Sequence, residues 1–120
     1  MKFLWTTLQV KDMAASLDFY QGFVGLKLNQ RHLAGPEVEM AFLGEGDTQV
    51  ELICSKSISH ETGGKGISIG FRVDSLEEIL KNVSQKGILI TREIYQPNPH
   101  VRFFFVEDPD GYQVQFVELS

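Results

Sequence analysis

The order of strand and turn signals in this chain of 120 residues occurs twice. The segment Gln49–Ile53, QVELI, returns about 64 positions later as QVQFV in Gln113–Val117. Leu8–Val10 and Phe71–Val73 are related by nearly the same offset. A turn signal rich in Gly and Asp precedes both Gln49–Ile53 and Gln113–Val117. One repetition in a chain of this length predicts two structural halves rather than a long solenoid.

The length of the chain predicts one domain over residues 1–120, and the repeat divides it into modules at about 1–57 and 64–120. The chain is 42% hydrophobic and 22% charged, so it can bury a core. It contains no apolar run near the ~20 residues that span a bilayer, and it does not start like a signal peptide, so we expect a cytoplasmic protein. The net charge is −5 and the Lys and Arg residues are scattered, which argues against nucleic acid as a partner.

The first half is predicted to contain a strand, a helix and three further strands. Leu4, Leu8 and Val10 alternate with polar residues, as in a strand. Asp12 can cap a helix, which Gly25 ends. The remaining strands of this half are predicted at 26–28, 38–42 and 48–54.

The second half repeats this order. Ile67–Val73 alternates like a strand, and Ser75 and Glu78 match a capping box, in which each side chain satisfies the other residue's backbone N–H. Gly87 is expected to end the helix. Residues 93–100 include two prolines and are predicted to form a loop, because proline cannot donate to a central ladder. The remaining strands are predicted at 88–90, 101–106 and 112–119.

Apolar residues share one face of the predicted strands, because side chains alternate across a strand. We expect the two amphipathic helices to cover this face. The pattern predicts an α+β fold of two βαβββ modules, whose curved mixed sheet forms a half-barrel with the helices on its convex side. The apolar set comprises Leu4, Leu8, Val10, Val50, Leu52, Cys54, Ile67, Ile69, Phe71, Val73, Val114 and Phe116.

The opposite face is rich in uncharged polar groups and has one indole. This mixture is typical of a ligand cavity, where a few polar groups orient a molecule. An ordinary half-wetted sheet face and a dimer interface are the alternatives. The face comprises Trp5, Thr7, Gln9, Gln49, Glu51, Ile53, Ser68, Gly70, Arg72, Gln113, Gln115 and Val117.

Several segments resemble the vicinal oxygen chelate superfamily, which includes glyoxalase I, bleomycin-resistance proteins and extradiol dioxygenases. The matching segments are Leu8–Met13, Ser16–Tyr20, Val24–Leu26 and above all Val106–Tyr112, with its EDPDG turn. The resemblance spans nearly the whole chain. It implies the fold of this superfamily, but no single activity, because the superfamily hosts many chemistries.

The resemblance also implies where a metal ion would bind. Members similar to glyoxalase I use one ligand from each of the first, fourth, fifth and eighth strands, typically His or Gln, Glu, His and Glu. The matching positions hold Trp5, Glu51, Ser68 and Gln115. Of these, only Glu51 is the ligand type expected at its own position. An indole offers no lone pair, and neutral side chains repay little of an ion's dehydration. We therefore predict a degenerate metal site and no cofactor, with a divalent metal ion as the alternative.

Glutathione-dependent lyase activity is not expected from these positions. Gln115 cannot accept the proton that a carboxylate base takes in similar enzymes, which leaves Glu51 as the one candidate base. Positions where glyoxalase-like members often carry Arg and Asn for glutathione hold Gln9 and Ser55. Glu51 has two interpretations: it forms an ion pair with Arg72 in the cavity wall, or it anchors a ligand or acts as a base.

His32, His60 and His100 lie in predicted turns or loops. Surface histidines without a ligand are one interpretation, and a relocated metal site that combines one or two of them with Glu51 is the other. The single cysteine, Cys54, excludes an intrachain disulfide and a cysteine-based zinc site, and is predicted to be a buried, inert thiol.

Three functions follow from these observations. The first is a metal-independent protein, similar to the bleomycin-resistance group, that binds an aromatic or cationic small molecule between Trp5, Glu51 and the strand Phe103–Phe105. The second is an enzyme, a lactoylglutathione-lyase-like or other lyase, isomerase or dioxygenase with a non-standard metal site, and the third is a structural or partner-binding domain. We expect a homodimer, because the open sheet edges need cover, and no membrane partner. The predicted ligand-binding residues are Trp5, Thr7, Gln9, Glu51, Ser68, Arg72, Phe103 and Gln115.

Overall fold

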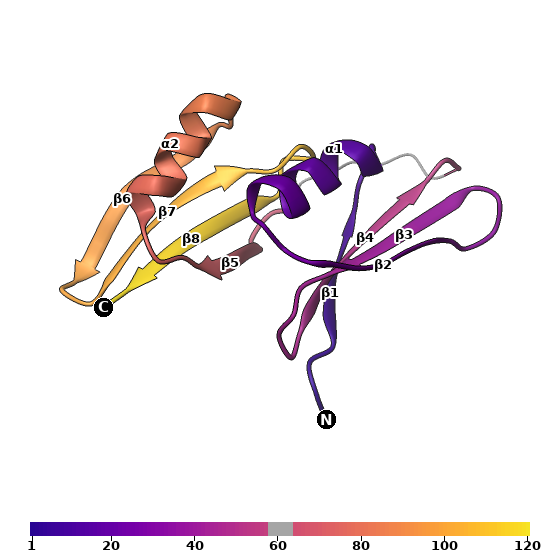
Figure 1. Ribbon diagram of the computed structural model, residues 1–120, viewed down its shortest axis with the longest axis horizontal. Helices are drawn as coiled ribbons and strands as arrows, with labels where there is room; N and C mark the ends of the chain where they lie inside the picture. Colours follow the sequence, from indigo (N-terminus) through magenta and orange to yellow (C-terminus); the bar gives the residue numbers. More distant parts are fainter. Residues whose placement is uncertain (58–63) are drawn as a thin grey trace. The chain divides into compact units, whose positions relative to one another are not determined.

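A computed structural model describes residues 1–57 and 64–120 of the chain (Figure 1). The chain divides into two compact units, Met1–Thr62 and Gly63–Ser120. Each unit contains an open, mixed four-stranded sheet and runs strand, helix, strand, strand, strand. This arrangement confirms the predicted α+β fold of βαβββ modules. In the described residues, no helix combines the length and the apolar character needed to cross a bilayer.

In the first unit the sheet order is β1-β4-β3-β2, where β1 is parallel to β4 and the other neighbours are antiparallel. The predicted first helix is split, because its second part is wound as a π-helix, η1. Gly25 follows this helix with φ +86°, a left-handed conformation that suits glycine. The elements are β1 (Trp5–Gln9), α1 (Met13–Leu17), η1 (Asp18–Phe23), β2 (Leu28–Leu33), β3 (Val38–Leu43) and β4 (Gln49–Ser55).

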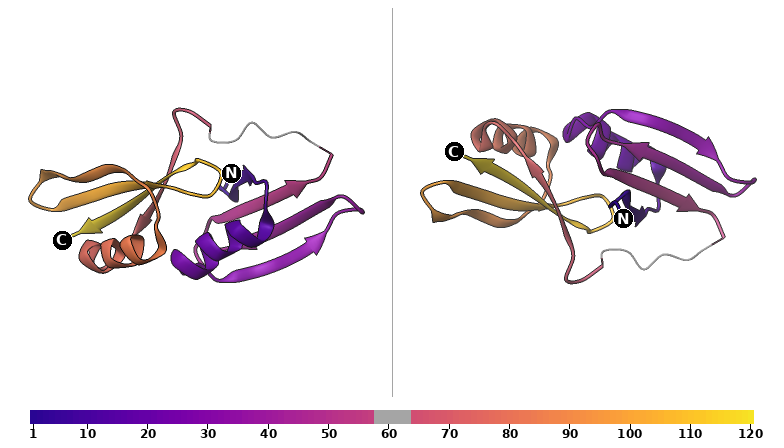
Figure 2. Two further views of the ribbon diagram at one scale, coloured as in Figure 1. Left: turned by 90° about the horizontal axis from the view of Figure 1, so that it is seen from above. Right: turned by 90° about the horizontal axis from the view of Figure 1, so that it is seen from below.

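The second unit has the same topology, with sheet order β5-β8-β7-β6 and β5 parallel to β8. Figure 2 shows this unit from two opposite sides, in the orange to yellow part of the colour scale. The ladder register repeats as well, since Thr7 lies opposite Glu51 in the first unit and Gly70 opposite Gln115 in the second. The internal repeat of the sequence therefore corresponds to a repeat of structure. The elements are β5 (Ser68–Arg72), α2 (Leu76–Lys86), β6 (Ile90–Asn98), β7 (Val101–Glu107) and β8 (Gln113–Leu119).

The predicted helix caps are largely present. The Asp12 carboxylate accepts the Ala15 N–H, and the Ser75 hydroxyl accepts the Glu78 N–H at 3.3 Å. Gly87 ends α2 in the left-handed region, at φ +66°. The return bond of the capping box, from the Ser75 N–H to the Glu78 carboxylate, does not occur among the hydrogen bonds of the described chain.

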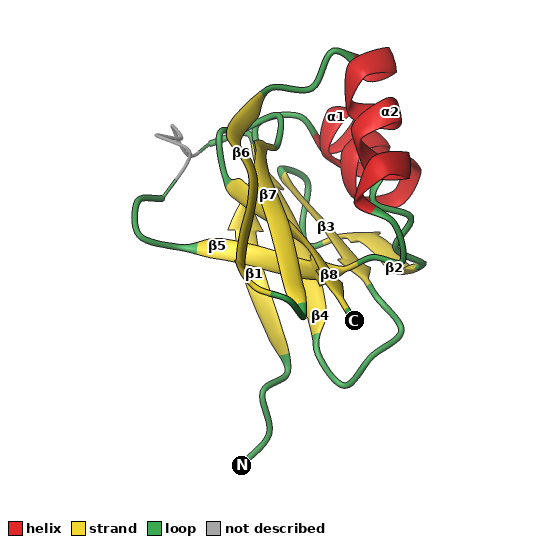
Figure 3. Cartoon of the chain, turned by 90° about the vertical axis from the view of Figure 1, so that its left-hand side faces the viewer, coloured by secondary structure: helices red, strands yellow, loops and turns green. Residues whose placement is uncertain are grey.

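Each unit buries the apolar face of its own sheet against its own helix, and Figure 3 distinguishes α1 and α2, in red, from the strands. The prediction was wrong for two members of the apolar set. Leu4 and Ile67 are 57% and 63% exposed, because each lies just before its strand begins. The confirmed core members include Leu8, Val10, Val50, Leu52, Val114 and Phe116.

The prediction of a loop at 93–100 was wrong, because most of that segment belongs to β6. Within the described residues this strand is at the edge of its sheet and pairs with β7 alone, with three register shifts along the ladder. Proline has no backbone N–H to donate. It is tolerated on an edge strand at positions where that N–H would face away from the ladder, because no ladder bond is then lost. The strand predicted at 26–28 was also misplaced, since β2 begins at Leu28.

Candidate functional site

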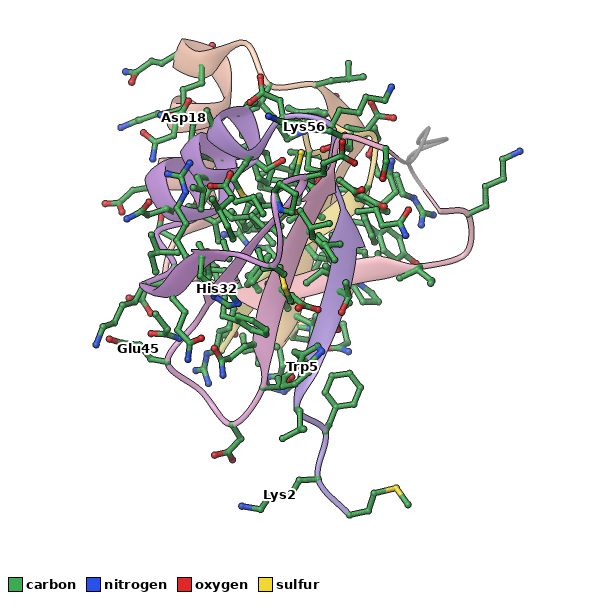
Figure 4. All side chains as sticks on the ribbon, turned by 90° about the vertical axis from the view of Figure 1, so that its right-hand side faces the viewer. Lys2, Trp5, Asp18, His32, Glu45 and Lys56 are labelled. Atoms are coloured by element: carbon green, nitrogen blue, oxygen red, sulfur yellow. The ribbon has the colours of Figure 1, made fainter. Side chains whose placement is uncertain are left out.

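The polar face of the first unit is built by alternation along β1. Leu8 is buried, and its neighbours Thr7 and Gln9 point to the other face, which also carries Trp5. Trp5 begins β1 and is 44% exposed. Figure 4 labels its side chain near the start of this strand. The predicted members of this face on β1 therefore lie together, on the side away from the core.

Glu51 is the buried charged group of this face. It lies on β4, directly opposite Thr7 on β1, and is only 6% exposed. The Thr7 hydroxyl donates a hydrogen bond to Oε1 of Glu51 at 2.5 Å. Among the described residues, Thr7 is the only donor to this carboxylate. Its second oxygen therefore has no hydrogen-bond donor within the described residues.

An aromatic pair lies next to Glu51. Phe42 on β3 is opposite Glu51 in the ladder, on the side away from Thr7. Its ring meets the indole of Trp5 edge to face, with centroids 5.2 Å apart and an angle of 73° between planes. The site in this unit thus combines a carboxylate, a hydroxyl and two aromatic rings.

The polar face of the second unit places Ser68, Gly70 and Gln115 on neighbouring strands. Ser68 lies opposite Gln113, and Gly70 lies opposite Gln115. A Cβ at Gly70 would come within 3.3 Å of Oε1 of Gln115, so the missing side chain leaves room for this amide. The predicted residues Ser68 and Gln115 therefore share one face of one sheet.

The phenylalanine-rich strand β7 divides between the two faces of its sheet. Phe103 and Phe105 are half-buried on the polar face, where their ring centroids lie 5.9 Å apart, and Tyr95 contacts Phe103 at 5.8 Å. Phe104 is fully buried and packs on Phe116 in the core. Its predicted place beside a ligand was therefore wrong, because its side chain alternates to the helix side.

Two further predicted residues, Gln9 and Arg72, lie near the ends of β1 and β5 and are exposed. Arg72 is opposite Val117 in the ladder, on the polar face of the second unit. Because Glu51 and Arg72 belong to different units, their ion pair stays a prediction. Ser55 is buried, and its hydroxyl lies 3.2 Å from that of Ser57.

The donors at the four matched positions do not fit a divalent metal ion of the glyoxalase type. They are an indole, a carboxylate, a hydroxyl and a primary amide, from Trp5, Glu51, Ser68 and Gln115. Within residues 1–57 and 64–120, no three His, Cys, Asp or Glu residues are grouped so that they could hold a metal ion. This donor set provides one anionic ligand, too few to repay the dehydration of such an ion.

Two histidines lie apart from these residues. His32 was predicted in a turn but lies exposed within β2, because this strand extends further than expected. His100 is in the turn between β6 and β7, where Nδ1 lies 3.2 Å from the Ser120 carbonyl oxygen. His60 lies outside the described residues. Cys54 is half-buried rather than buried, with Sγ 3.5 Å from the Lys11 carbonyl oxygen.

Two residues of the polar faces were missing from the predicted site: Phe42 and Arg92. Phe42 has the alternation that places it opposite Glu51, so the register of the ladder would have identified it. Arg92 lies on β6, opposite Phe105 and two residues beyond the end of the strand predicted at 88–90. Its place had no signal in the sequence, since β6 pairs irregularly with β7.

Comparison with known proteins identifies a family for nearly the whole chain. Residues 2–116 match the sequence model of the Glyoxalase/Bleomycin resistance protein/Dioxygenase superfamily. A lactoylglutathione lyase of Neisseria meningitidis serogroup A is 34% identical over 127 residues, which cover 98% of this chain and 91% of that protein.

Two solved structures have the same fold. A trypanothione-dependent glyoxalase I from Leishmania major superposes with a TM-score of 0.83 at 22% identity, over 98% of this chain and 86% of that one. The antibiotic binding protein TnmS3 from Streptomyces sp. CB03234 gives a TM-score of 0.77 at 18% identity, over 100% of this chain and 97% of that one. At such identities the likeness establishes the fold.

Proposed function

Since this chain belongs to the Glyoxalase/Bleomycin resistance protein/Dioxygenase superfamily, we propose that it binds a small organic molecule on its polar sheet faces without a glyoxalase-type metal ion. In the first unit the ligand is aromatic or cationic and contacts Trp5, Phe42 and Glu51. In the second unit the proposed contacts are Ser68, Arg72, Phe103 and Gln115. The antibiotic binding protein of the same fold supports this class of function.

The observation that carries the proposal is the buried carboxylate of Glu51 beside Trp5 and Phe42. Burial of an ionised carboxylate costs several kcal/mol in real proteins, and one hydroxyl donor offsets only part of that cost. An apolar side chain would serve the stability of the sheet better at this position. A carboxylate there is explained if its second oxygen receives a hydrogen bond or a charge from a ligand.

The aromatic pair sets the chemistry of that ligand. The exposed indole of Trp5 can stack on a flat ring or attract a cation, and each such contact contributes about 0.5–2 kcal/mol. The edge-to-face contact with Phe42 holds the indole in place. The pair therefore favours flat and positively charged molecules over anionic ones.

Fluorescence of Trp5, the sole tryptophan, tests the proposal directly. A panel of flat aromatic and cationic compounds is titrated into the protein, and we expect a saturable change with some of them. The Glu51→Gln variant should then weaken binding about tenfold, through loss of a charged partner. The matched control is Glu45→Gln, in the exposed turn before β4, which should bind as the parent does. A panel without any response, or equal binding by Glu51→Gln, would contradict the proposal.

An enzyme is the second candidate, because curated relatives are named lactoylglutathione lyase. It requires a divalent metal ion held by residues other than the matched set, with Glu51 as the remaining candidate base. The test is elemental analysis of protein purified without chelators, together with an assay of hemithioacetal conversion. Stoichiometric metal with turnover would establish the enzyme and overturn the metal-free proposal.

We also propose a single domain over residues 1–120 that assembles as a homodimer. In each unit the outer strands β1, β2, β5 and β6 are edge strands, whose backbone groups are paired on one side only. Exposed Phe3 and Leu4 precede the edge strand β1 and add apolar surface there. Light scattering at high protein concentration should give the dimer mass, and a monomer mass would refute the assembly.

A further inference from the structure

A hollow of about 290 Å³ opens on the polar face of the second unit. The ladder brings its walls together, because Ser68 on β5 lies opposite Gln113 on β8, and Arg92 on β6 lies opposite Phe105 on β7. The hollow is large enough for a small organic molecule of one ring. Its lining residues are Gly66, Ile67, Ser68, Arg92, Phe105 and Gln113.

Arg92 gives this hollow a positive charge. Its guanidinium carbon lies 5.6 Å from the centroid of the Phe105 ring, a cation–π contact that keeps the group over the hollow. Within the described chain, no acidic side chain forms an ion pair with Arg92. Glu107 neighbours Gln113 in the ladder, but it does not line the hollow. The guanidinium is therefore held in position and has its fork of N–H donors available.

Gln113 and Ser68 add further donors. The Thr91 hydroxyl donates to Oε1 of Gln113 at 2.6 Å, which fixes the orientation of this amide. The NH₂ group of Gln113 is therefore the end that remains to donate to another group. The Ser68 hydroxyl is the neighbouring polar group in the ladder. A guanidinium, an amide NH₂ and a hydroxyl together favour a ligand that accepts hydrogen bonds and carries negative charge.

Apolar surface completes the hollow. Phe105 is half-buried, and Ile67 is 63% exposed although its side chain is large and aliphatic. This exposed isoleucine and the guanidinium of Arg92 both line the hollow, which therefore has an apolar part and a charged part. Such a pair of parts matches an amphipathic anion, with an apolar body and one charged end.

We propose that this hollow is a carboxylate-binding site, in which Arg92 and Gln113 hold the carboxylate of a small organic acid and Phe105 and Ile67 contact its apolar body. A planar guanidinium pairs with a planar carboxylate through two parallel hydrogen bonds, which favours a carboxylate over a tetrahedral anion. The assignment rests on the proposed function, because it takes the same face of the second unit as ligand-facing and names the ligand chemistry.

Titration of the full chain with benzoate, followed by amide chemical shifts in NMR, tests this site. We expect saturable shifts at Ser68, Phe105 and Gln113 at millimolar benzoate. Benzamide has the same shape without the charge and should bind about ten- to a hundredfold more weakly. Binding of benzoate near the indole of Trp5 is measured separately by fluorescence. A fluorescence response therefore reports on the first unit and is not evidence for binding in this hollow.

Arg92→Met tests the role of the guanidinium, and Lys81→Met, on the exposed face of α2, is its matched control for loss of one positive charge. Arg92→Met should weaken the binding of benzoate about ten- to a hundredfold, and Lys81→Met should leave this binding unchanged. Dispersed NMR spectra of the Arg92→Met variant would show that it folds. Equal binding of benzoate and benzamide, no effect of Arg92→Met, or shifts outside the hollow would overturn the proposal. Displacement of benzoate by equimolar inorganic phosphate would also overturn it, since the site would then accept any oxyanion.

This outcome is separable from that of the proposed function. Responses of Trp5 to aromatic or cationic compounds, without benzoate shifts in the second unit, would leave the proposed function standing and remove the carboxylate site. Benzoate shifts at the hollow, without any response of Trp5, would retain the carboxylate site and remove the ligand proposed for the first unit.

Discussion

Glu118, near the end of the last strand, accepts a hydrogen bond from the backbone N–H of Leu76, the first residue of α2, over 2.9 Å. The first N–H groups of a helix have no partner within the helix, and a carboxylate satisfies them well. Arg102 joins the same group, with Nη2 2.7 Å from Oε1 of Glu118 and 3.0 Å from Oε1 of Glu77. The start of α2 is thereby tied to β7 and β8.

Replacement of Glu118 by Ala should loosen the start of α2. The Leu76 N–H loses its acceptor and Arg102 loses its shorter ion pair, so the first turn of the helix opens more often. We expect at least about tenfold faster hydrogen exchange at the Leu76 amide and a lower melting temperature. Glu78→Ala is the control, since this exposed carboxylate of the same helix has no hydrogen bond or ion pair among the described residues. Equal exchange in both variants would contradict the role of Glu118.

The same cluster predicts how stability depends on pH. The Leu76 N–H and then Arg102 lower the pKa of Glu118, and the backbone N–H of Glu77 and then Arg102 lower that of Glu77, both from an ordinary value of 4.5. A carboxyl with a lowered folded-state pKa stabilises the fold above its unfolded pKa, and this stability is lost as pH falls through the folded pKa. Urea denaturation should therefore show stability that falls from about pH 5 downward. Arg102→Met should flatten this acid limb, and a limb of unchanged slope would be evidence against the cluster.

Phe103 and Phe104 should respond differently to truncation although they are neighbours on β7. Phe104 is fully buried against Phe116, so Phe104→Ala should destabilise the protein by about 3–5 kcal/mol. Phe103 is half-buried on the polar face, so Phe103→Ala should cost clearly less in the same denaturation experiment. Equal losses would show that the two side chains do not lie on opposite faces.

Removal of the Thr7 hydroxyl should cost stability because Glu51 then has no hydrogen-bond donor among the described residues. Thr7→Val keeps the shape of the side chain, and the buried carboxylate loses its bond at a cost of about 1–3 kcal/mol. The control is Thr6→Val, the same change on the preceding residue of β1, whose hydroxyl has no partner within the described chain. A difference below the error of urea denaturation would show that the bond contributes nothing.

Much of the fold follows from local patterns. The alternation around Leu8 and Val50 predicted both strands and their buried faces, and Asp12 and Ser75 marked the helix starts, because caps and alternation depend on near neighbours. The Pro97 segment could not be predicted in the same way. Whether proline interrupts a strand depends on its place in the sheet, and β6 is an edge strand.

The polar faces were predicted better than the contacts made on them. Alternation placed Trp5 and Thr7 on the face of Glu51, and Ser68 on the face of Gln115. It carried no information on the bulged β6 ladder, which brings Arg92 over Phe105. Bulges change which residues are opposite each other, so a site beside one is revealed only when the ladder is known.

By itself the sequence determined the repeat, the order of the strands and helices and the faces of most strands, because these depend on periodicity and on caps within a few residues. Only the tertiary structure decided that Thr7 donates to Glu51 and that Glu118, not Glu78, completes the cap of α2. These partners lie 44 and 42 residues apart in the chain. A hydrogen bond needs two atoms within about 3 Å, and across such separations only the register of paired strands and the packing of a helix on its sheet bring them together.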